Sequence, residues 1–439
     1  MKKGTALATA LLAVPVCVLA QQSPPPPIAA PPAPPRADTS QPLPTRITLD
    51  EAIRLALQHN HALLAARTTI LQNQAQETTA NLRPNPTLSW DTQFLPLFQP
   101  NNFTANYFEN QAQFDLGIGY LFERGRKRQH RLQAAKDATA VTRAQVTDNE
   151  RQLTFNVSQQ FVNVLLAQST LDLAQQDYDS FQKTVEISEA RFKAGDMSEG
   201  DLLKIKLQLL QFQSDVFAAR LSKVQAIAAL RQAVGFESVP DNFDVVGELD
   251  YQPVHAGLDD LKALALSSRP DLQAAHLGVT AAQSQESLAE ANGKRDLNVS
   301  FDYTHTAGVN SGAFFFNIDL PIFDRNQGEI ARTKYAITQS QELQSESAQQ
   351  VITDVVDAYE ALRSNDQIIQ LYRGGYVEQA QKSRDITEYA YKKGAASLLD
   401  FLDSERTYRA NQLAYRQALA SYMTALEQMR EAVGTRSLP

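Results

Sequence analysis

The chain has 439 residues and a mass of 48.6 kDa, enough for about two to four domains of ordinary size. Its 49 Asp and Glu outnumber its 41 Lys and Arg, and the net charge of -8 argues against nucleic-acid binding, which needs basic side chains to neutralise phosphates. The single cysteine, Cys17, excludes an internal disulfide, a CxxC redox site and a cysteine-based iron–sulfur or zinc site.

Residues 1–20 have the features of a secretory signal peptide. Lys2 and Lys3 precede an apolar stretch at 5–19, and cleavage after Ala20 satisfies the usual small-residue pattern. The apolar stretch is too short to span a membrane as a helix. Cys17 leaves open a second interpretation, a lipidated cysteine, although the preceding Val16 is not the small residue that this processing prefers. On either interpretation the chain crosses the inner membrane.

Residues 21–44 form a proline-rich segment. Ten of the 20 prolines fall between Pro24 and Pro44. Because proline lacks an N–H group and fixes φ, this stretch cannot be a helix or a central strand. We interpret it as an extended tether that precedes the folded part of the chain.

Very long helices are expected after this tether. No Gly or Pro occurs from Arg126 to Ala194, and a continuous helix of that length would extend for about 100 Å. Apolar residues recur there at steps of three and four, which places them along one helix face. Such helices bury a narrow seam, as in coiled-coil hairpins. Similar stretches without breakers cover residues 45–83, 201–234, 329–373 and 395–433, while Gly374-Gly375 is expected to kink the helix that it interrupts.

The chain contains an internal duplication. The segment Phe192–Ser198 is similar to Tyr391–Ser397, and the two halves end alike at Gly235 and Gly434. We therefore expect a first repeat at 45–240, a linker at 241–256 and a second repeat at 257–435.

Each repeat also contains two segments in which apolar and polar residues alternate, the signature of strands. They lie near 87–94 and 113–122 in the first repeat, and near 298–304 and 314–320 in the second. These are either amphipathic hairpins on a soluble core or membrane strands with Leu116 and Phe316 facing lipid and Ser300 facing a wet lumen. The aromatic density of one face favours the membrane. Because four strands cannot close a barrel, several chains would have to pool their strands.

This order of elements resembles the TolC-type outer membrane efflux proteins over nearly the whole chain after Thr45. The run Leu320-Pro321-Ile322-Phe323-Asp324-Arg325-Asn326-Gln327-Gly328, followed by Ile330-Ala331-Arg332, is similar to the branch that serves cobalt-zinc-cadmium resistance pumps. The resemblance implies a mainly α fold with a small membrane β part. Duplicated long-helix hairpins would form a tunnel through the periplasm, and four strands per chain would contribute to a 12-stranded barrel in the outer membrane of a homotrimer. It also implies a periplasmic adaptor and an inner-membrane pump of the RND type as partners, with no cofactor and no enzymatic activity.

By the same resemblance, Gly195 and Gly394 lie at the hairpin tips, which form the periplasmic entrance. From the residues alone, Ser397 with Asp400 fits a capping box, and Ser198 with Asp201 repeats it. Asp403 lies three residues after Asp400 and therefore on the same helix face. The resemblance implies that this acidic pair points into the entrance, where Asp400 and Asp403 of a trimer would form two stacked rings of carboxylates that attract cations.

Other candidate sites are weaker. His59 and His61 stand two apart on an expected helix and so face different directions, which argues against a metal site. The basic run 124–128 follows an expected strand and is interpreted as a lipid-interface anchor or a helix cap. We therefore expect a passive outer membrane duct, with heavy-metal cations as cargo. The alternatives are a duct for multidrug efflux or type I protein secretion, a soluble periplasmic coiled-coil adaptor, and a helical periplasmic enzyme, against which the lack of a catalytic motif counts.

Overall fold

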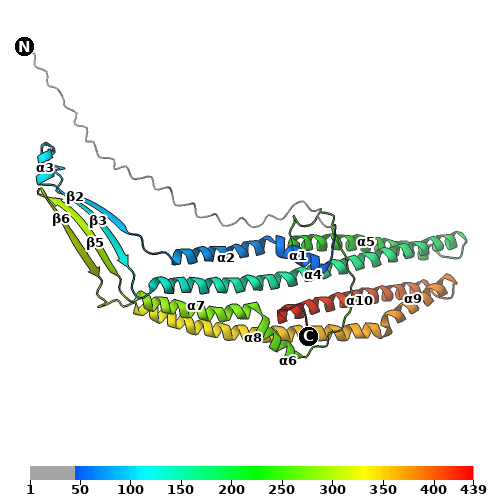
Figure 1. Ribbon diagram of the computed structural model, residues 1–439. Coiled ribbons are helices and arrows are strands. Elements are labelled where there is room, and N and C mark those ends of the chain that lie inside the picture. The colour runs from blue at the N-terminus through cyan, green and yellow to red at the C-terminus, as the bar shows by residue number, and fades with distance from the viewer. Residues whose placement is uncertain (1–44, 439) are drawn as a thin grey trace, which may run out of the picture. The chain divides into compact units, whose positions relative to one another are not determined.

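The computed structural model describes residues 45–438, so that the expected signal peptide and tether lie outside the described residues. Two similar series of elements follow each other along the chain (Figure 1). The first contains β1 (Arg46–Ile47), α1 (Leu49–His59), α2 (His61–Ala80), β2 (Thr87–Gln93), a 3₁₀ helix at Pro100–Asn102, α3 (Ala105–Asn110), β3 (Gln113–Phe122), α4 (Lys127–Lys193) and α5 (Glu199–Val234). The second contains β4 (Asp244–Val245), α6 (Leu258–Ser268), α7 (Pro270–Asn292), β5 (Leu297–Thr306), β6 (Val309–Ile318), α8 (Gln327–Leu371), a π-helical turn at Tyr372–Tyr376, α9 (Val377–Lys392) and α10 (Leu398–Val433).

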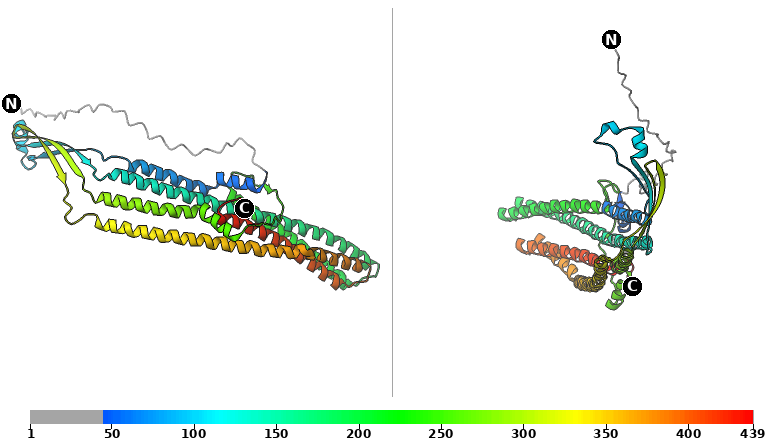
Figure 2. Two further views of the ribbon diagram at one scale, coloured as in Figure 1. Left: turned by 60° about the horizontal axis from the view of Figure 1, so that its bottom comes forward. Right: turned by 90° about the vertical axis from the view of Figure 1, so that its left-hand side faces the viewer.

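The long helices pack side by side in a layer. The 67 residues of α4 are unbroken, as the lack of Gly and Pro predicted. This helix packs against α2 and α7 near the strands, and against α5 and α10 farther along, as Figure 2 shows. At the end far from the strands, α4 with α5 and α9 with α10 form two helical hairpins. Within the described residues, no helix is both long and apolar enough to cross a bilayer.

The continuous helix expected over residues 45–83 is wrong, because the chain breaks at Asn60. The backbone of Asn60 is extended, and its side-chain oxygen accepts a hydrogen bond from the Leu63 N–H, which starts α2. Its side-chain amide also donates to the Ala233 carbonyl at 2.9 Å. The break needs no Gly or Pro, since Asn is a favoured N-cap. It also places His59 and His61 on different helices.

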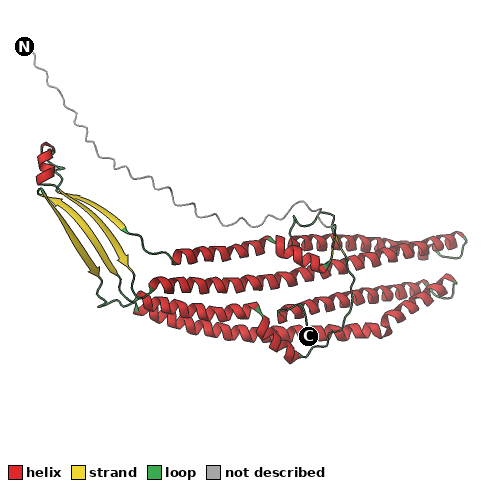
Figure 3. Cartoon of the chain, viewed as in Figure 1, coloured by secondary structure: helices red, strands yellow, loops and turns green. Residues whose placement is uncertain are grey.

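The four-stranded sheet has the order β2-β3-β5-β6, and all its neighbouring strands are antiparallel (Figure 3). Three strands lie close to their expected positions, whereas β6 begins at Val309, five residues earlier than expected. The start of β6 is small and polar and carries little alternating signal. It is fixed instead by the two-residue turn Ala307-Gly308, where both residues have positive φ, as tight hairpins require.

Each repeat has its own apolar core beside the middle of the layer. The first core joins α1 to α4 and α5 around Phe161 and Leu230, and it includes Ile47 of β1 and Val245 of β4. The second joins α6 to α8 and α10 around Tyr422. The short parallel pair of β1 and β4 therefore attaches the start of the described chain to the segment between the repeats.

The passage from strand to helix is built in the same way in both repeats. Arg126 and Asn326, immediately before α4 and α8, both have left-handed backbone with φ of 58° and 63°. Lys127 forms an ion pair with Asp296 at 2.7 Å, and Asp296 also accepts from the Arg124 N–H at 2.9 Å. Part of the basic run 124–128 thus connects the first repeat to the second.

The second repeat interrupts its long helix where the first does not. Between α8 and α9 the chain forms one π-helical turn, in which Gly375 has φ of 107°. This confirms that Gly374-Gly375 disturbs the helix, as a π-type distortion does. Only Gly375 has the left-handed backbone, and no other atoms crowd Gly374.

The two neighbouring glycines are therefore expected to respond in opposite ways to alanine. Gly375→Ala places a Cβ on a left-handed backbone and should destabilise the fold by about 1–2 kcal/mol. Gly374→Ala removes a flexible residue at a spacious helical position and should be neutral or stabilising by up to about 1 kcal/mol. Thermal unfolding of the detergent-solubilised protein, followed by circular dichroism, measures both. Equal shifts of Tm for the two variants would contradict the assignment of the left-handed backbone to Gly375 alone.

Candidate functional site

The two hairpin tips are built alike. Gly195 follows α4 with φ of 83°, and Gly394 follows α9 with φ of 78°. Both glycines end a helix in the left-handed conformation that glycine adopts without strain. Nothing lies within 4 Å of the position that a Cβ would occupy at either residue. The glycines are therefore needed for the turn and not for close packing.

Serine side chains cap the helices that leave the tips. Ser397 Oγ accepts from the Asp400 N–H at 3.1 Å, and the Asp400 carboxylate accepts from the Ser397 N–H at 3.2 Å, which confirms the predicted capping box. Ser198 Oγ accepts from the Asp201 N–H in the same way. The Asp201 carboxylate, however, accepts a hydrogen bond from the Ser198 hydroxyl. That hydroxyl and Lys204 lower the pKa of Asp201.

Asp400 and Asp403 are both exposed on the first turns of α10, but their surroundings differ. Asp400 is held in the capping box, so its position has a structural explanation. Among the described residues, no ion pair or hydrogen bond of the Asp403 side chain accounts for its position. Phe401 and Leu402, which lie between these two aspartates, pack into the apolar cluster of the hairpins.

Four aromatic rings connect the two hairpins above the tips. Tyr391 stacks on Phe401 at 5.1 Å between centroids within the second hairpin. Phe401 then lies 6.2 Å from Phe181 across the gap to the first hairpin, with parallel planes, and Phe181 stacks on Phe212 at 4.7 Å. All four helices of this region thus contribute one ring to a continuous buried stack. Aromatic pairs at these separations are worth about 0.5–1.5 kcal/mol each beyond their area.

A charged cluster lies next to this stack. Arg409 of α10 donates to Asp177 of α4 at 3.1 Å and to Asp215 of α5 at 2.5 Å. Its guanidinium also lies 4.2 Å from the Phe212 ring centroid. Burial raises the pKa of Asp177, and the Arg409 guanidinium opposes that shift. One arginine therefore links the second hairpin to both helices of the first.

The aromatic stack and the charged cluster lie where the two hairpins meet, and we call this contact the seam. Glu405 of α10 is buried in the seam without an ion-pair partner among the described residues. Its residue is only 7% exposed. Burial raises its pKa from 4.5 to about 7, against the attraction of Arg384, and the negative charges of Asp177 and Glu388 add to the rise. The contact between the hairpins therefore contains a carboxyl that holds its proton to a higher pH than an exposed glutamate does.

The helical layer has two uncovered edges at the level of the tips. On α5, large apolar side chains recur at steps of four, three and seven, and each is at least half exposed. This is the heptad spacing of a coiled-coil seam. The opposite edge, formed by α8 and α9, also exposes large apolar side chains. The α5 edge carries Leu203, Leu207, Leu210, Phe217, Leu221 and Val224, and the α8–α9 edge carries Ile368, Leu371, Tyr376, Ile386 and Tyr389.

One face of the sheet is apolar and exposed. Leu116 lies opposite Trp90 on β2 and Tyr303 on β5, and Phe316 of β6 lies opposite Val299. The strand register thus places the two residues predicted to face lipid on one face of the sheet. Trp90 is 77% exposed, and its neighbours on this face are also largely uncovered.

The other face is polar and tightly built. A Cβ at Gly117 would lie 1.9 Å from the Asp302 carboxylate and 2.5 Å from the Ser89 hydroxyl, so these side chains share the face of Gly117. Ser300 lies opposite Gly119 and belongs to this face. A larger residue at Gly117 would displace the polar side chains of the neighbouring strands.

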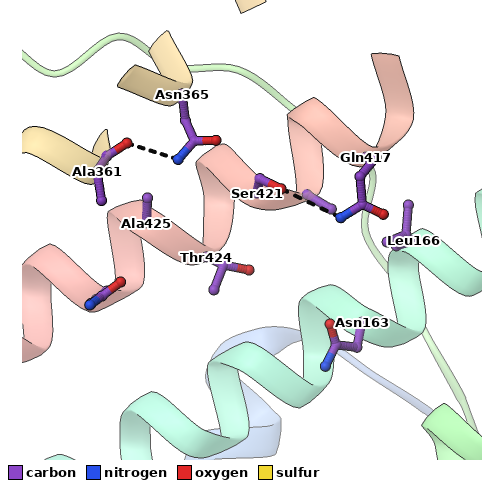
Figure 4. Close-up of a pocket in the computed structure, with 10 residues that line it drawn as sticks. Asn163, Leu166, Ala361, Asn365, Gln417, Ser421, Thr424 and Ala425 are labelled. Carbon is purple, nitrogen blue, oxygen red and sulfur yellow. Dashed lines mark hydrogen bonds between the residues drawn. The ribbon is translucent and has the colours of Figure 1, made fainter. Parts of the chain in front are cut away.

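A cavity of about 280 Å³ lies between α4, α8 and α10. Its walls carry carboxamide, hydroxyl and small apolar side chains but no charged group (Figure 4). Asn365 donates to the Ala361 carbonyl and Gln417 to the Ser421 hydroxyl. This lining contains no nucleophile paired with a base. Within residues 45–438, no three His, Asp or Glu side chains are grouped so as to hold a metal ion.

Sequence reasoning found the tips and the faces of the sheet but missed the charged seam. Glu405 and Arg409 occur in a helix with many charged residues and read as an exposed face. One signal could have found Glu405: it follows Phe401 by four residues and precedes Tyr408 by three, which places it on the buried stripe. Nothing in the sequence shows that Arg409 meets Asp177 and Asp215.

Comparisons with known proteins agree with this architecture. A family model described as outer membrane efflux protein matches residues 52–236 and 261–435. The cobalt-zinc-cadmium resistance protein CzcC of Cupriavidus metallidurans is 25% identical over 394 residues, which cover 89% of this chain and 88% of CzcC. The pyoverdine export outer membrane protein OpmQ of Pseudomonas aeruginosa is 26% identical over 416 residues, with coverage of 88% and 85%.

A solved structure shows the same fold. The crystal structure of the outer membrane protein VceC of Vibrio cholerae superposes with a TM-score of 0.71 at 19% identity, covering 88% of this chain and 96% of VceC. These findings confirm the resemblance to TolC-type efflux proteins and the mainly α fold with a small sheet. The family that the chain matches consists of efflux proteins and not of enzymes.

The titration of Glu405 predicts a pH-dependent effect of Glu405→Gln. The stability contributed by the protonated carboxyl is present below its ordinary pKa of 4.5 and is lost as the pH rises through about 7. A glutamine stays neutral, so the variant should gain on the order of 1–3 kcal/mol over the natural protein at pH 8 and little at pH 5. Thermal unfolding at the two pH values measures this difference.

Glu189→Gln is the matched control, because Glu189 is an exposed carboxylate of the first hairpin that pairs with Lys206. Its effect on Tm should be small at both pH values. A gain by Glu405→Gln that is the same at pH 5 and pH 8 would show that Glu405 does not titrate in this range.

Proposed function

Since the chain belongs to the outer membrane efflux protein family, we propose that it forms the outer membrane channel of a tripartite efflux system. The channel is a homotrimer that conducts passively. Its helices extend into the periplasm, where they meet a periplasmic adaptor and an inner-membrane pump of the RND type. The observation that carries this proposal is the four-stranded sheet, which combines an exposed apolar face with two edges that no described strand pairs.

The sheet supports a membrane-embedded trimer for a physical reason. Backbone groups on an open edge have no water to bind in the bilayer core, so β2 and β6 must pair with other strands. Three copies would bring 12 strands into one closed barrel, with Leu116 and Phe316 toward lipid and the polar face with Ser300 toward the lumen. A soluble adaptor with the same helices would have no use for an exposed apolar sheet face.

The edges of the helical layer support the same assembly. The heptad seam of α5 is uncovered, and the α8–α9 edge exposes apolar residues at similar distances from the tip. Leu203 and Ile386 each lie eight residues from the tip glycine of their hairpin. In a closed ring the α5 edge of one copy would meet the α8–α9 edge of the next, so the barrel and the tunnel would close by the same rotation.

Heavy-metal cations are the proposed cargo. The relative CzcC is described by its role in cobalt, zinc and cadmium resistance. The relative OpmQ, whose name records export of pyoverdine, keeps open the alternative of organic molecules, and a secreted polypeptide is a further alternative. A duct contacts its cargo loosely, so the pump would make most of the selection.

The hairpin tips are proposed as the periplasmic entrance of this channel. Gly195 and Gly394 turn the chain there, and Ser198, Asp201 and Ser397 stabilise the helix ends. Asp400 and Asp403 would form rings of three carboxylates each. Rings of like charge attract cations and are relieved by them.

Arginine substitutions on the two faces of the sheet test the channel. Leu116→Arg and Phe316→Arg would place a charge against lipid and should impair trimer assembly by ~2–4 kcal/mol if the sites lie near the bilayer midplane. Ser300→Arg, on the polar face, should assemble and conduct. Native electrophoresis and planar-bilayer conductance measure the outcomes. A natural chain that remains a monomer without detergent, or equal damage by all three substitutions, would exclude the proposed barrel.

Asp403→Asn tests the entrance and the cationic cargo together. The variant should assemble normally but show weaker block of single-channel current by multivalent cations added on the periplasmic side, because a ring of three charges is removed. Glu378→Gln, which removes an exposed carboxylate far from the tip, is the control and should leave block unchanged. Asp400→Asn is less clean because it also disturbs a cap worth ~1 kcal/mol. Unchanged block in Asp403→Asn and in the double variant would leave both residues with a structural role only.

A further inference from the structure

The two repeats connect their strands very differently at the end of the sheet away from the helices. In the second repeat, Ala307 and Gly308 alone join β5 to β6. In the first, residues 94–112 lie between β2 and β3, and we call this segment the outer loop. A hairpin closes with two to five residues, so the extra length is not needed to pair the strands. Long ordered loops of this kind usually serve a function.

The outer loop is ordered by its own contacts. Phe94 has a φ of 56°, which turns the chain away from β2. The Leu97 N–H donates to the Leu95 carbonyl at 2.8 Å, and the Gln99 N–H donates to the Pro96 carbonyl at 3.0 Å. Thr104 then caps α3. Residues 94–99 therefore form a hydrogen-bonded turn whose backbone is restricted by Pro96.

The outer loop lies on the apolar side of the sheet. Phe108 of α3 packs on Phe114 of β3 at 6.4 Å between ring centroids, and the Glu109 carbonyl accepts from the His305 ring at 3.2 Å. Phe114 and His305 lie opposite each other and share the face of Leu116. The Gly308 N–H also donates to the Glu109 carbonyl at 2.8 Å. In Figure 1, α3 lies at the far end of the strands.

The turn presents apolar side chains to its surroundings. Phe98 is 98% exposed, Leu97 is 66% exposed, and Phe103 is about half exposed. From Phe94 to Ala112 the only charged residue is Glu109, and the polar residues are mostly Asn and Gln. Uncharged segments that combine aromatic and amide side chains suit the boundary between lipid and water.

We propose that the outer loop is a membrane anchor that inserts Leu97 and Phe98 into the outer leaflet beside the barrel. This inference rests on the proposed function, in which the apolar face of the sheet contacts lipid, and it extends that lipid contact beyond the strands. The loop's contacts with the sheet are made to Phe114 and His305, at the far ends of the two central strands β3 and β5. Its inserted side chains would fix the depth of the barrel in the membrane.

The single tryptophan, Trp90 on the apolar face of β2, makes a direct test possible. The double variant Trp90→Phe/Phe98→Trp moves the only tryptophan to the turn. The purified trimer is reconstituted in phosphatidylcholine vesicles whose acyl chains carry bromine, which quenches tryptophan only in contact with lipid. We expect a blue-shifted emission and a loss of intensity comparable to that of Trp90 in the natural chain, with weak quenching by aqueous iodide.

Controls separate this inference from the proposed function. Trp90→Phe/Phe236→Trp places the reporter in the helical part, where iodide should quench it and bromine should not. Trp90→Phe/Leu97→Trp repeats the measurement at the neighbouring residue, should the first variant fail to assemble. If Trp90 in the natural chain is not quenched by bromine, the sheet is not in lipid and the channel proposal fails with the anchor.

Two outcomes overturn the anchor while leaving the channel intact, provided that Trp90 is quenched by bromine. Strong iodide quenching of the Phe98→Trp reporter would place the turn in water. A blue-shifted emission that resists both iodide and bromine would place it against protein, as in a contact with a second copy.

Discussion

The outer edges of β2 and β6 carry backbone hydrogen-bonding groups that no strand within residues 45–438 satisfies, and much of the structure depends on how these groups are paired. An edge of this kind is tolerated in water but not in lipid. The helical layer also has an uncovered edge, because the apolar heptad positions of α5 have no partner within the described chain. Both layers run from first-repeat elements at one edge to second-repeat elements at the other. In the proposed trimer, a single rotation between copies would therefore cover every open edge at once.

Within one copy, the contact between α4 and α10 holds the two hairpins together near the tips. The aromatic stack through Phe401 and Phe181 supplies apolar contact, and Arg409 supplies directional bonds to Asp177 and Asp215. Glu405 opposes both, because its ionised form is buried beside other carboxylates. Any separation of the hairpins would hydrate Glu405 and favour its charge. The stability of this contact between the hairpins therefore depends on pH, through the protonation of Glu405.

The fold was readable from the sequence wherever one physical rule dominated. The absence of Gly and Pro predicted α4, and alternation with its aromatic residues predicted the strands and their faces. The sequence was less informative at Asn60, where a side-chain hydrogen bond starts a new helix in a stretch without Gly or Pro. It was also less informative at Val309, where a tight turn and not an alternation of residues sets the start of β6. Contacts between distant segments, such as the ion pair of Arg409 with Asp177, produce no periodic pattern in the sequence. Candidate residues at the tips were found because capping has a local signature, and the seam was missed because ion pairing has none.

The duplication gives a further way to locate function, through the places where the repeats differ. Symmetry accounts for the paired tips, the paired junctions at Arg126 and Asn326, and the two cores, which need no separate functional explanation. Two departures remain. The long helix of the second repeat contains a π-helical turn at Gly375 where α4 is continuous, and the strand connection of the first repeat is extended by the outer loop. A glycine inside a long helix and a row of exposed apolar side chains both reduce the stability of an isolated chain. Features of that kind persist when the assembled protein uses them, and the proposed membrane anchor gives such a use to the outer loop.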